Sequence, residues 1–534
     1  MKKSAFVLFY VLFSGFIINA FAQLETGENV AVTETESGKV RGYINNSIFT
    51  YKGIPYAEAA RFESPQKPKP WTNVRSSMVY GAVAPLLEPT TTVTDEPEFV
   101  FNHSWGFTNE NCMSINVWTP GLKDGKKRPV MFWIHGGGFT SGSSQELPSY
   151  DGEALAKKGD LVVVSINHRL NILGYLDLSA YGEKYKESAN LSILDMKMAL
   201  EWVKSNIANF GGDASNVTIF GQSGGGAKVN TLMAMPSAKG LFHKAINQSG
   251  SFRSALLDKN TTQALAAEVI KELGLSADKI DEIQKIPFPI LSKAGAKAIT
   301  TISNKLKAEG KPVGGFGLSW GPSVDGQVLP YQLLSNEAME LSKDIPLLIG
   351  TTKNEFTPFR GALPKNTSEA KAIEALKAMY ADKTDAYVTA LKKAYPNIQA
   401  AEYKDIDVSF RPGAVYQANL KSDVNKGAAV YMYLFDWQSP VMDGKYKAVH
   451  CMEIPFVFNN IARCAEMTGG KKDAVDLSLK MSQSWINFAK TGNPNHKGLV
   501  TWPAYNTTNT ATMHFDINCE VKPQLDKDLF EVVK

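Results

Sequence analysis

Residues 217–228 read VTIFGQSGGGAK, and this stretch decides the fold. Its first four residues, 217–220, are β-branched or aromatic, which predicts a buried strand. Gly221-Gln222-Ser223-Gly224-Gly225 follows at once, and residues 226–235 are compatible with a helix. A strand, a glycine-rich turn around a serine and a helix are typical of a nucleophile elbow, in which a strained turn lifts the serine hydroxyl above a sheet. An ordinary structural loop is the alternative interpretation.

Similar apolar runs occur on both sides of this stretch and predict further strands. They are 130–135 (VMFWIH), 161–167 (LVVVSIN), 345–350 (IPLLIG) and 430–437 (VYMYLFDW). Residues 193–210 have apolar side chains at helical spacing. Continuous apolar strands separated by helices indicate an α/β fold with a large, mostly parallel central sheet covered by helices on both faces. Residues 262–275 and 369–393 are predicted as helices that leave the sheet and pass over its edge.

A second glycine-rich motif, His135-Gly136-Gly137-Gly138-Phe139, ends the strand predicted at 130–135. Consecutive glycines let backbone N–H groups point at one spot without side chains in the way. The oxyanion of a tetrahedral intermediate needs such donors, each worth about 3 kcal/mol. Gly137 and Gly138 are the expected donors, and the N–H of Gly224 adds a third. A phosphate-binding loop is the alternative, but no Gly-Lys-Ser/Thr follows.

The general base must come from seven histidines: His103, His135, His168, His243, His450, His496 and His514. A chain with this elbow orders its triad as serine, acid, histidine, which favours the last three. His450 lies in a loop after the strand predicted at 430–437 and is our choice. His496 lies in a Gly-Asn-Pro-Asn-His turn, and His514 alternates with apolar residues, as on the exposed face of a strand.

The acid of the triad should follow the preceding strand of the sheet. Glu355 does so after residues 345–350, and its task would be to hold the imidazole tautomer and to stabilise the imidazolium. Asp325 is the main rival, but a turn role suits its Val-Asp-Gly context better. Asp443 lies too near His450 in the sequence to follow a strand of its own.

Composition and charge narrow the class of protein. The 534 residues are 44% hydrophobic, and 57 basic against 53 acidic residues give a net charge of +4. No stripe of Lys and Arg interleaved with aromatics is present, so we expect no nucleic-acid partner. Neither Cys-x-x-Cys nor His-Glu-x-x-His occurs, so we expect no metal.

The first 22 residues are typical of a signal peptide. Lys2 and Lys3 precede an apolar run at 5–18, and Ala20-Phe21-Ala22 is a small-x-small cleavage site. The run is short for a bilayer span. We therefore expect a secreted or periplasmic protein without a stable membrane anchor after cleavage, in which residues 23–534 form one domain.

An exported protein can form disulfides, and this chain has four cysteines: Cys112, Cys451, Cys464 and Cys519. Four cysteines allow three full pairings, between which the sequence cannot choose. Cys451 and Cys464 are close in the sequence and make a plausible pair.

Taken together, these motifs resemble the type B carboxylesterases, the cholinesterase-like branch of the α/β-hydrolases, and in particular the secreted bacterial members. The resemblance covers about residues 40–534. Its landmarks are YKGIPYA (51–57), ENCMSINV (110–117), HGGGF (135–139), NHRLNILGYL (167–176), NFGGDASNVTIFGQSGGG (209–226), HCMEIPFVF (450–458), WINFAKTGNPN (485–495) and TWPAYN (501–506).

The resemblance implies a triad of Ser223, Glu355 and His450 and an oxyanion hole formed by Gly137, Gly138 and Gly224. It also implies a supporting place for Ser249 behind the acid, and structural ion pairs between Arg61 and Glu110 and between Arg169 and Asp195. Gln222, next to the nucleophile, is expected to support the site as well.

Two departures from the family pattern stand out. Gln222-Ser223-Gly224 replaces the usual Glu-Ser-Ala, and Ala84-Pro85 stands near the place where the family has a cysteine partner for Cys112.

The expected activity is hydrolysis of neutral, small to medium carboxylic esters through an acyl-enzyme, without a cofactor. The neutral preference follows from Gln222, which removes a carboxylate beside the nucleophile. Another acyl hydrolase on the same fold, such as an amidase, lipase or lactonase, remains an alternative, because the chemistry is shared. A binding protein with a dead site is the second alternative.

Overall fold

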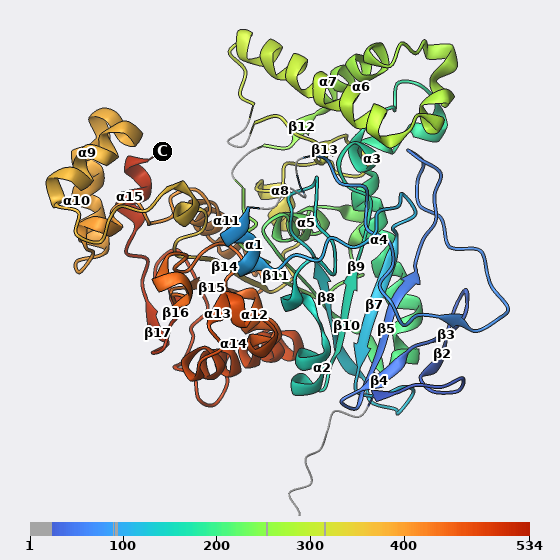
Figure 1. The fold of residues 1–534 in the computed structure, drawn as a ribbon, viewed down its shortest axis with the longest axis horizontal. Coiled ribbons are helices and arrows are strands. Elements are labelled where there is room, and N and C mark those ends of the chain that lie inside the picture. The colour runs from blue at the N-terminus through green and yellow to red at the C-terminus, as the bar shows by residue number, and fades with distance from the viewer. Residues whose placement is uncertain (1–23, 89, 91–93, 253–254, 314–316, 534) are drawn as a thin grey trace, which may run out of the picture.

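A computed structural model describes residues 24–88, 90, 94–252, 255–313 and 317–533 of the chain (Figure 1). The predicted signal peptide, residues 1–22, lies outside the described residues. The centre is a twelve-stranded sheet. In spatial order its strands are β1 (Leu24–Glu25), β4 (Tyr43–Asn45), β5 (Ile48–Pro55), β7 (Ser114–Thr119), β9 (Val162–Ile166), β8 (Arg128–Ile134), β10 (Gly212–Gln222), β11 (Lys244–Gln248), β14 (Leu347–Thr352), β15 (Val430–Phe435), β16 (Thr512–Phe515) and β17 (Glu520–Lys522).

The seven consecutive strands from β9 to β16 pair in parallel, and the strands at both ends of the sheet are antiparallel. The predicted α/β fold with a large, mostly parallel sheet is therefore confirmed. All five predicted strands are present, as β8, β9, β10, β14 and β15.

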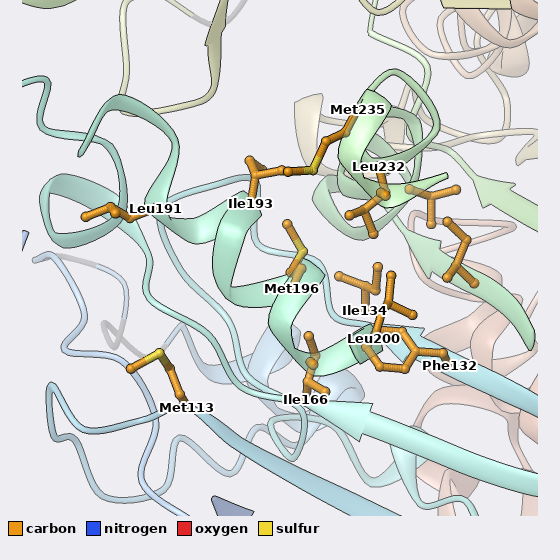
Figure 2. Close-up of a cluster of buried hydrophobic side chains, with 14 of the residues drawn as sticks. Met113, Phe132, Ile134, Ile166, Leu191, Ile193, Met196, Leu200, Leu232 and Met235 are labelled. Atoms are coloured by element: carbon orange, nitrogen blue, oxygen red, sulfur yellow. The ribbon is translucent and has the colours of Figure 1, made fainter. Parts of the chain in front are cut away.

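Helices cover both faces of this sheet, which explains why its strands are apolar on both sides. In β8, Phe132 and Ile134 point toward α4 (Leu191–Asn206) and α5 (Gly224–Met233), whereas Trp133 packs on the opposite face with α14 (Lys472–Thr491). Figure 2 shows Met196 and Leu200 of α4 against Phe132, Ile134 and Leu232. This packing fixes the start of α5, and hence the turn at Ser223.

The remaining elements surround this core. The other helices are α1 (Asp95–Phe101), α2 (Glu153–Gly159), α3 (Asn171–Tyr175), α6 (Lys259–Glu272), α7 (Phe288–Ala308), α8 (Asn336–Leu341), α9 (Glu369–Tyr380), α10 (Thr384–Ala394), α11 (Arg411–Ser422), α12 (Ile454–Phe458), α13 (Ala465–Thr468) and α15 (Lys527–Val532). Two small sheets consist of β2 (Val32–Thr35), β3 (Gly38–Arg41) and β6 (Arg75–Ser76), and of β12 (Leu257–Asp258) and β13 (Ser323–Val324).

The two predicted peripheral helical segments are present. Residues 262–272 of the first segment belong to α6, which begins at Lys259, ends at Glu272 and packs with α7 above the carboxyl ends of the strands (Figure 1, top). Residues 369–393 form two helices, α9 and α10, instead of one, because the chain turns at Ala381 with φ +47°.

The structure describes all four cysteines and both predicted ion pairs. All four cysteines are unpaired, so the Cys451–Cys464 disulfide is wrong. Both ion pairs suggested by the resemblance are present: Arg61 donates to both carboxylate oxygens of Glu110, and Arg169 does the same to Asp195. No helix in the described part of the chain is long and apolar enough to cross a membrane.

Candidate active site

Ser223, Ser249 and Glu355 follow three neighbouring strands at the same edge of the sheet. Ser223 comes directly after β10, Ser249 directly after β11 and Glu355 three residues after β14. Each has a positive φ: +58° for Ser223, +52° for Ser249 and +36° for Glu355. Left-handed backbone is costly for residues other than glycine, so three such turns at one edge indicate a site held in place by its surroundings.

The turn at Ser223 has the geometry of a nucleophile elbow. Its φ of +58° and ψ of −125° place it between β10 and the first turn of α5. The Ser223 N–H donates to the carbonyl of Gln248 at 2.8 Å, and its carbonyl accepts from the Ala227 N–H at 3.0 Å. The side chain is half-buried and lines a cavity.

Glu355 is fully buried, and its two oxygens have different partners. Oε1 accepts hydrogen bonds from Ser249 Oγ at 2.7 Å and from the Thr352 N–H at 2.9 Å. Oε2 contacts His450 Nδ1. The carboxylate is thus fixed from behind by Ser249, as the resemblance suggested, and faces the imidazole.

The loop that carries His450 is bound alongside the segment of Glu355. The His450 N–H donates to the Glu355 carbonyl at 3.0 Å, and the Ala448 N–H donates to Asn354 Oδ1 at 3.1 Å. His450 is 5% exposed. Its Nε2 lies 3.3 Å from Gln222 Nε2, and no hydrogen bond joins it to Ser223 among the described residues.

The rival residues lie elsewhere. His496 contacts the carbonyls of Lys480 and Lys497. His514 is on β16, as predicted, but it is buried rather than exposed. Asp436, whose oxygen lies 2.5 Å from its Nδ1, gives the imidazole a partner there. Asp325 holds a turn by accepting N–H groups from residues 327–329, as its context predicted.

The predicted oxyanion donors lie beside the elbow. A Cβ on Gly137 (φ +78°) would lie 2.3 Å from the carbonyl oxygen of Ser141, and a Cβ on Gly224 would lie 2.4 Å from the Gly138 nitrogen. At position 224 the family that the chain resembles usually has alanine. Glycine here therefore lets the elbow approach the glycine loop at Gly138 closely. An alanine would require the loop at Gly138 to move.

The direction of each donor follows from what its peptide carbonyl binds, since C=O and N–H point in opposite directions in a trans peptide. The Gly137 carbonyl accepts from the Ser141 N–H at 3.0 Å, which turns the Gly138 N–H away from that loop. The bond from Ala227 to the Ser223 carbonyl orients the Gly224 N–H in the same way. Among the described residues, no acceptor occupies either donor.

A cavity of about 1240 Å³ opens in front of Ser223 and reaches α6 and α7. Gly138, Phe356 and Phe410 line it near the nucleophile. The rings of Phe356 and Phe410 lie with their centroids 4.3 and 5.2 Å from that of His450. We did not predict these two residues. Phe356 could have been found as the neighbour of Glu355, whereas no motif marks Phe410.

Further buried carboxyls lie near Glu355. Burial and the charge of Glu355 raise the pKa of Glu453 and that of Asp407 to about 7 each. As the pH falls, both groups therefore take up a proton at a higher pH than an ordinary carboxyl does. Protonation of these two limits the negative charge that gathers behind His450.

Known proteins resemble this chain along most of its length. The chain matches the sequence model of the carboxylesterase family over residues 29–532. It is 35% identical over 513 residues to the para-nitrobenzyl esterase of Bacillus subtilis (strain 168), covering 93% of this chain and 97% of the relative. It is 30% identical over 504 residues to the phenmedipham hydrolase of Pseudarthrobacter oxydans, covering 90% and 94%.

Among solved structures, the chain resembles an esterase from the anaerobic Clostridium hathewayi that can hydrolyse aliphatic aromatic polyesters. The TM-score is 0.84 at 36% sequence identity, and the match covers 96% of this chain and 99% of that one.

Proposed function

The chain belongs to the carboxylesterase family, a family of serine carboxylic ester hydrolases, and we propose that it cleaves neutral, small to medium esters through an acyl-enzyme on Ser223. One observation carries the proposal. His450, paired with Glu355, lies 3.3 Å from Gln222 of the elbow, and Ser223 lines the cavity beside glycine N–H groups that lack acceptors in the described structure.

The proposed mechanism is acyl transfer in two steps. His450 Nε2 takes the Ser223 proton as Oγ attacks the ester carbonyl, while Glu355 stabilises the imidazolium through Nδ1–H. The N–H groups of Gly137, Gly138 and Gly224 donate hydrogen bonds to the oxyanion. The intermediate collapses, His450 protonates the leaving alcohol, and water repeats the sequence to release the acid. The hydrogen bond between Ser223 and His450 forms in the substrate complex, where catalytic contacts often tighten.

The lining of the cavity favours neutral substrates. Its lining includes Gly138, Ala227 and Phe356 besides Ser223. The charged residues of the lining, Asp258, Lys305, Glu309 and Lys311, belong to β12, to α7 and to the segment after α7. The names of two relatives, a para-nitrobenzyl esterase and an esterase of aliphatic aromatic polyesters, agree with this chemistry. A volume of about 1240 Å³ leaves room for an aromatic acyl or alcohol group.

We also propose that cleavage after Ala22 releases residues 23–534 as one secreted or periplasmic domain. The basis is the N-terminal pattern alone. No cofactor is required by the proposed chemistry.

The preference for neutral esters is tested by Gln222→Glu. A unit charge about 5 Å from a cation is worth roughly 3 kcal/mol at an effective dielectric near 20. Water in an open cavity reduces this to about 1 kcal/mol. We therefore expect Gln222→Glu to raise the kcat/KM of a trimethylammonium ester, relative to its neutral isostere, by about fivefold. The measurement is this ratio in wild type and variant.

The control is Gln483→Glu, the same change on α14, where the side chain donates to Asn487 instead of contacting His450, and it should leave the ratio unchanged. A wild-type preference for the cation of about tenfold or more would contradict the proposed substrate class. If Gln222→Glu changes the kcat/KM of the cationic and of the neutral ester by the same factor, position 222 acts through the base instead. The 3.3 Å approach of Gln222 Nε2 to His450 Nε2 makes this second outcome a real alternative.

A further inference from the structure

Lys228 is a buried lysine in the second turn of α5, five residues after the nucleophile. It is fully buried and forms no ion pair within 4.0 Å in the described structure. Its Nζ donates instead to two successive backbone carbonyls, that of His135 at 3.1 Å and that of Gly136 at 3.4 Å. Both carbonyls belong to the loop that leads from β8 into the glycine motif.

The Gly136 carbonyl and the Gly137 N–H belong to one peptide unit. In a trans peptide the two groups point in opposite directions. A donor that holds the Gly136 carbonyl on the side of Lys228 therefore turns the Gly137 N–H away from Lys228. A Cβ on Gly136 would lie 3.5 Å from the Cβ of Ser223, which places this peptide beside the nucleophile.

Each oxyanion donor has its own anchor. The peptide of Gly138 is fixed by Ser141, and that of Gly224 by Ala227. The peptide of Gly137 is fixed by His135 Nδ1, at 3.0 Å from the Gly136 carbonyl, and by Lys228. The peptides of Gly138 and Gly224 each have a backbone N–H donor that a side-chain substitution leaves in place. The peptide of Gly137 is held by two side chains, so a substitution of Lys228 can loosen it.

Glu146 accompanies this lysine. It is buried, accepts hydrogen bonds from Tyr150 and from the Ser143 N–H, and does not pair directly with Lys228. A Cβ on Gly142 would lie 2.7 Å from the Gly136 oxygen and 3.2 Å from Glu146 Oε1, so the carboxyl borders the same space. Burial lowers the pKa of Lys228 to about 7 against the attraction of Glu146. Charged or neutral, the amine retains N–H groups to donate.

We propose that Lys228 is a positioning residue of the ester hydrolysis: by holding the carbonyls of His135 and Gly136 it aims the Gly137 N–H at the oxyanion. The inference rests on the proposed function. It predicts that loss of Lys228 weakens the binding of the transition state and leaves the binding of the ground-state ester nearly unchanged.

The test is Lys228→Met, which keeps the length and removes the donor. Removing an oxyanion donor costs about 10² to 10³ in kcat, and a misaimed donor costs part of that. We expect kcat to fall about tenfold or more and KM to stay within about threefold. A trifluoromethyl ketone, which forms a hemiketal oxyanion with the serine, should lose affinity by the same factor as kcat/KM.

The matched control is Lys421→Met. Lys421 lies in α11, is also fully buried, and also donates to a backbone carbonyl, that of Ser342, which is not part of the glycine loops. We expect this variant to lower the melting temperature without changing kcat or the affinity of the ketone. If Lys228→Met does not fold, the double variant Lys228→Met/Glu146→Gln, which buries neither charge, is measured against the same criteria.

Wild-type kcat and wild-type affinity for the ketone in a folded Lys228 variant would overturn the inference. A loss of kcat with unchanged affinity for the ketone would also overturn it, because the oxyanion would then be bound normally. These results differ from a failure of the proposed function, in which wild type would not hydrolyse esters or Ser223→Ala would remain active.

Discussion

Ser223→Ala is expected to leave a folded protein without measurable ester hydrolysis. The substitution removes only the hydroxyl group. The elbow is held by backbone hydrogen bonds to Gln248 and Ala227, which alanine retains. Loss of the nucleophile of a triad typically costs about 10⁴-fold or more in kcat. The measurement is kcat on a neutral ester, together with circular dichroism and the melting temperature.

Ser251→Ala is the matched control for this experiment. Ser251 is a buried serine two residues after Ser249, and its hydroxyl donates to Gln417 at 2.6 Å instead of reaching the cavity. It should lose stability but keep its activity within a few-fold. More than about a tenth of wild-type activity in a folded Ser223→Ala would remove Ser223 from the mechanism, given the loss expected.

Five of the seven parallel strands could be predicted from sequence because they are apolar on both faces. The exception among the strands beside the site is β11. Its sequence, KAINQ, has polar residues at three of five positions, although every one of them is buried. Asn247 and Gln248 are satisfied by Gln417 and Glu453, which are distant in the sequence, and a local pattern cannot reveal such partners.

The candidate triad could be proposed from sequence because each member follows a recognisable strand. What the sequence could not show is which atoms meet. His514 has a carboxylate partner, Asp436, much as His450 has Glu355, and only the cavity and the elbow distinguish the two pairs. The role that we propose for Lys228 was not visible either, because a lysine in a helix is usually solvated and this one is buried.

The two histidine–carboxylate pairs offer a direct test of the role of Glu355. Glu355→Gln keeps the size of the side chain and removes its charge. The Thr352 N–H and Ser249 Oγ both donate to Oε1. The backbone N–H cannot reverse, so the amide oxygen of the glutamine has to take this place. Its NH₂ group then faces His450 Nδ1.

An NH₂ group can only donate, so it pairs with His450 when Nδ1 is unprotonated and the proton sits on Nε2. That tautomer cannot accept the Ser223 proton. We therefore expect kcat to fall by about 10⁴ with little change in the fold. Asp436→Asn imposes a similar change on His514 and should lower only stability, since that pair lies outside the lining of the cavity. If a folded Glu355→Gln kept more than about a tenth of wild-type kcat, or if both variants lost activity equally, Glu355 would not be the acid that orients the base.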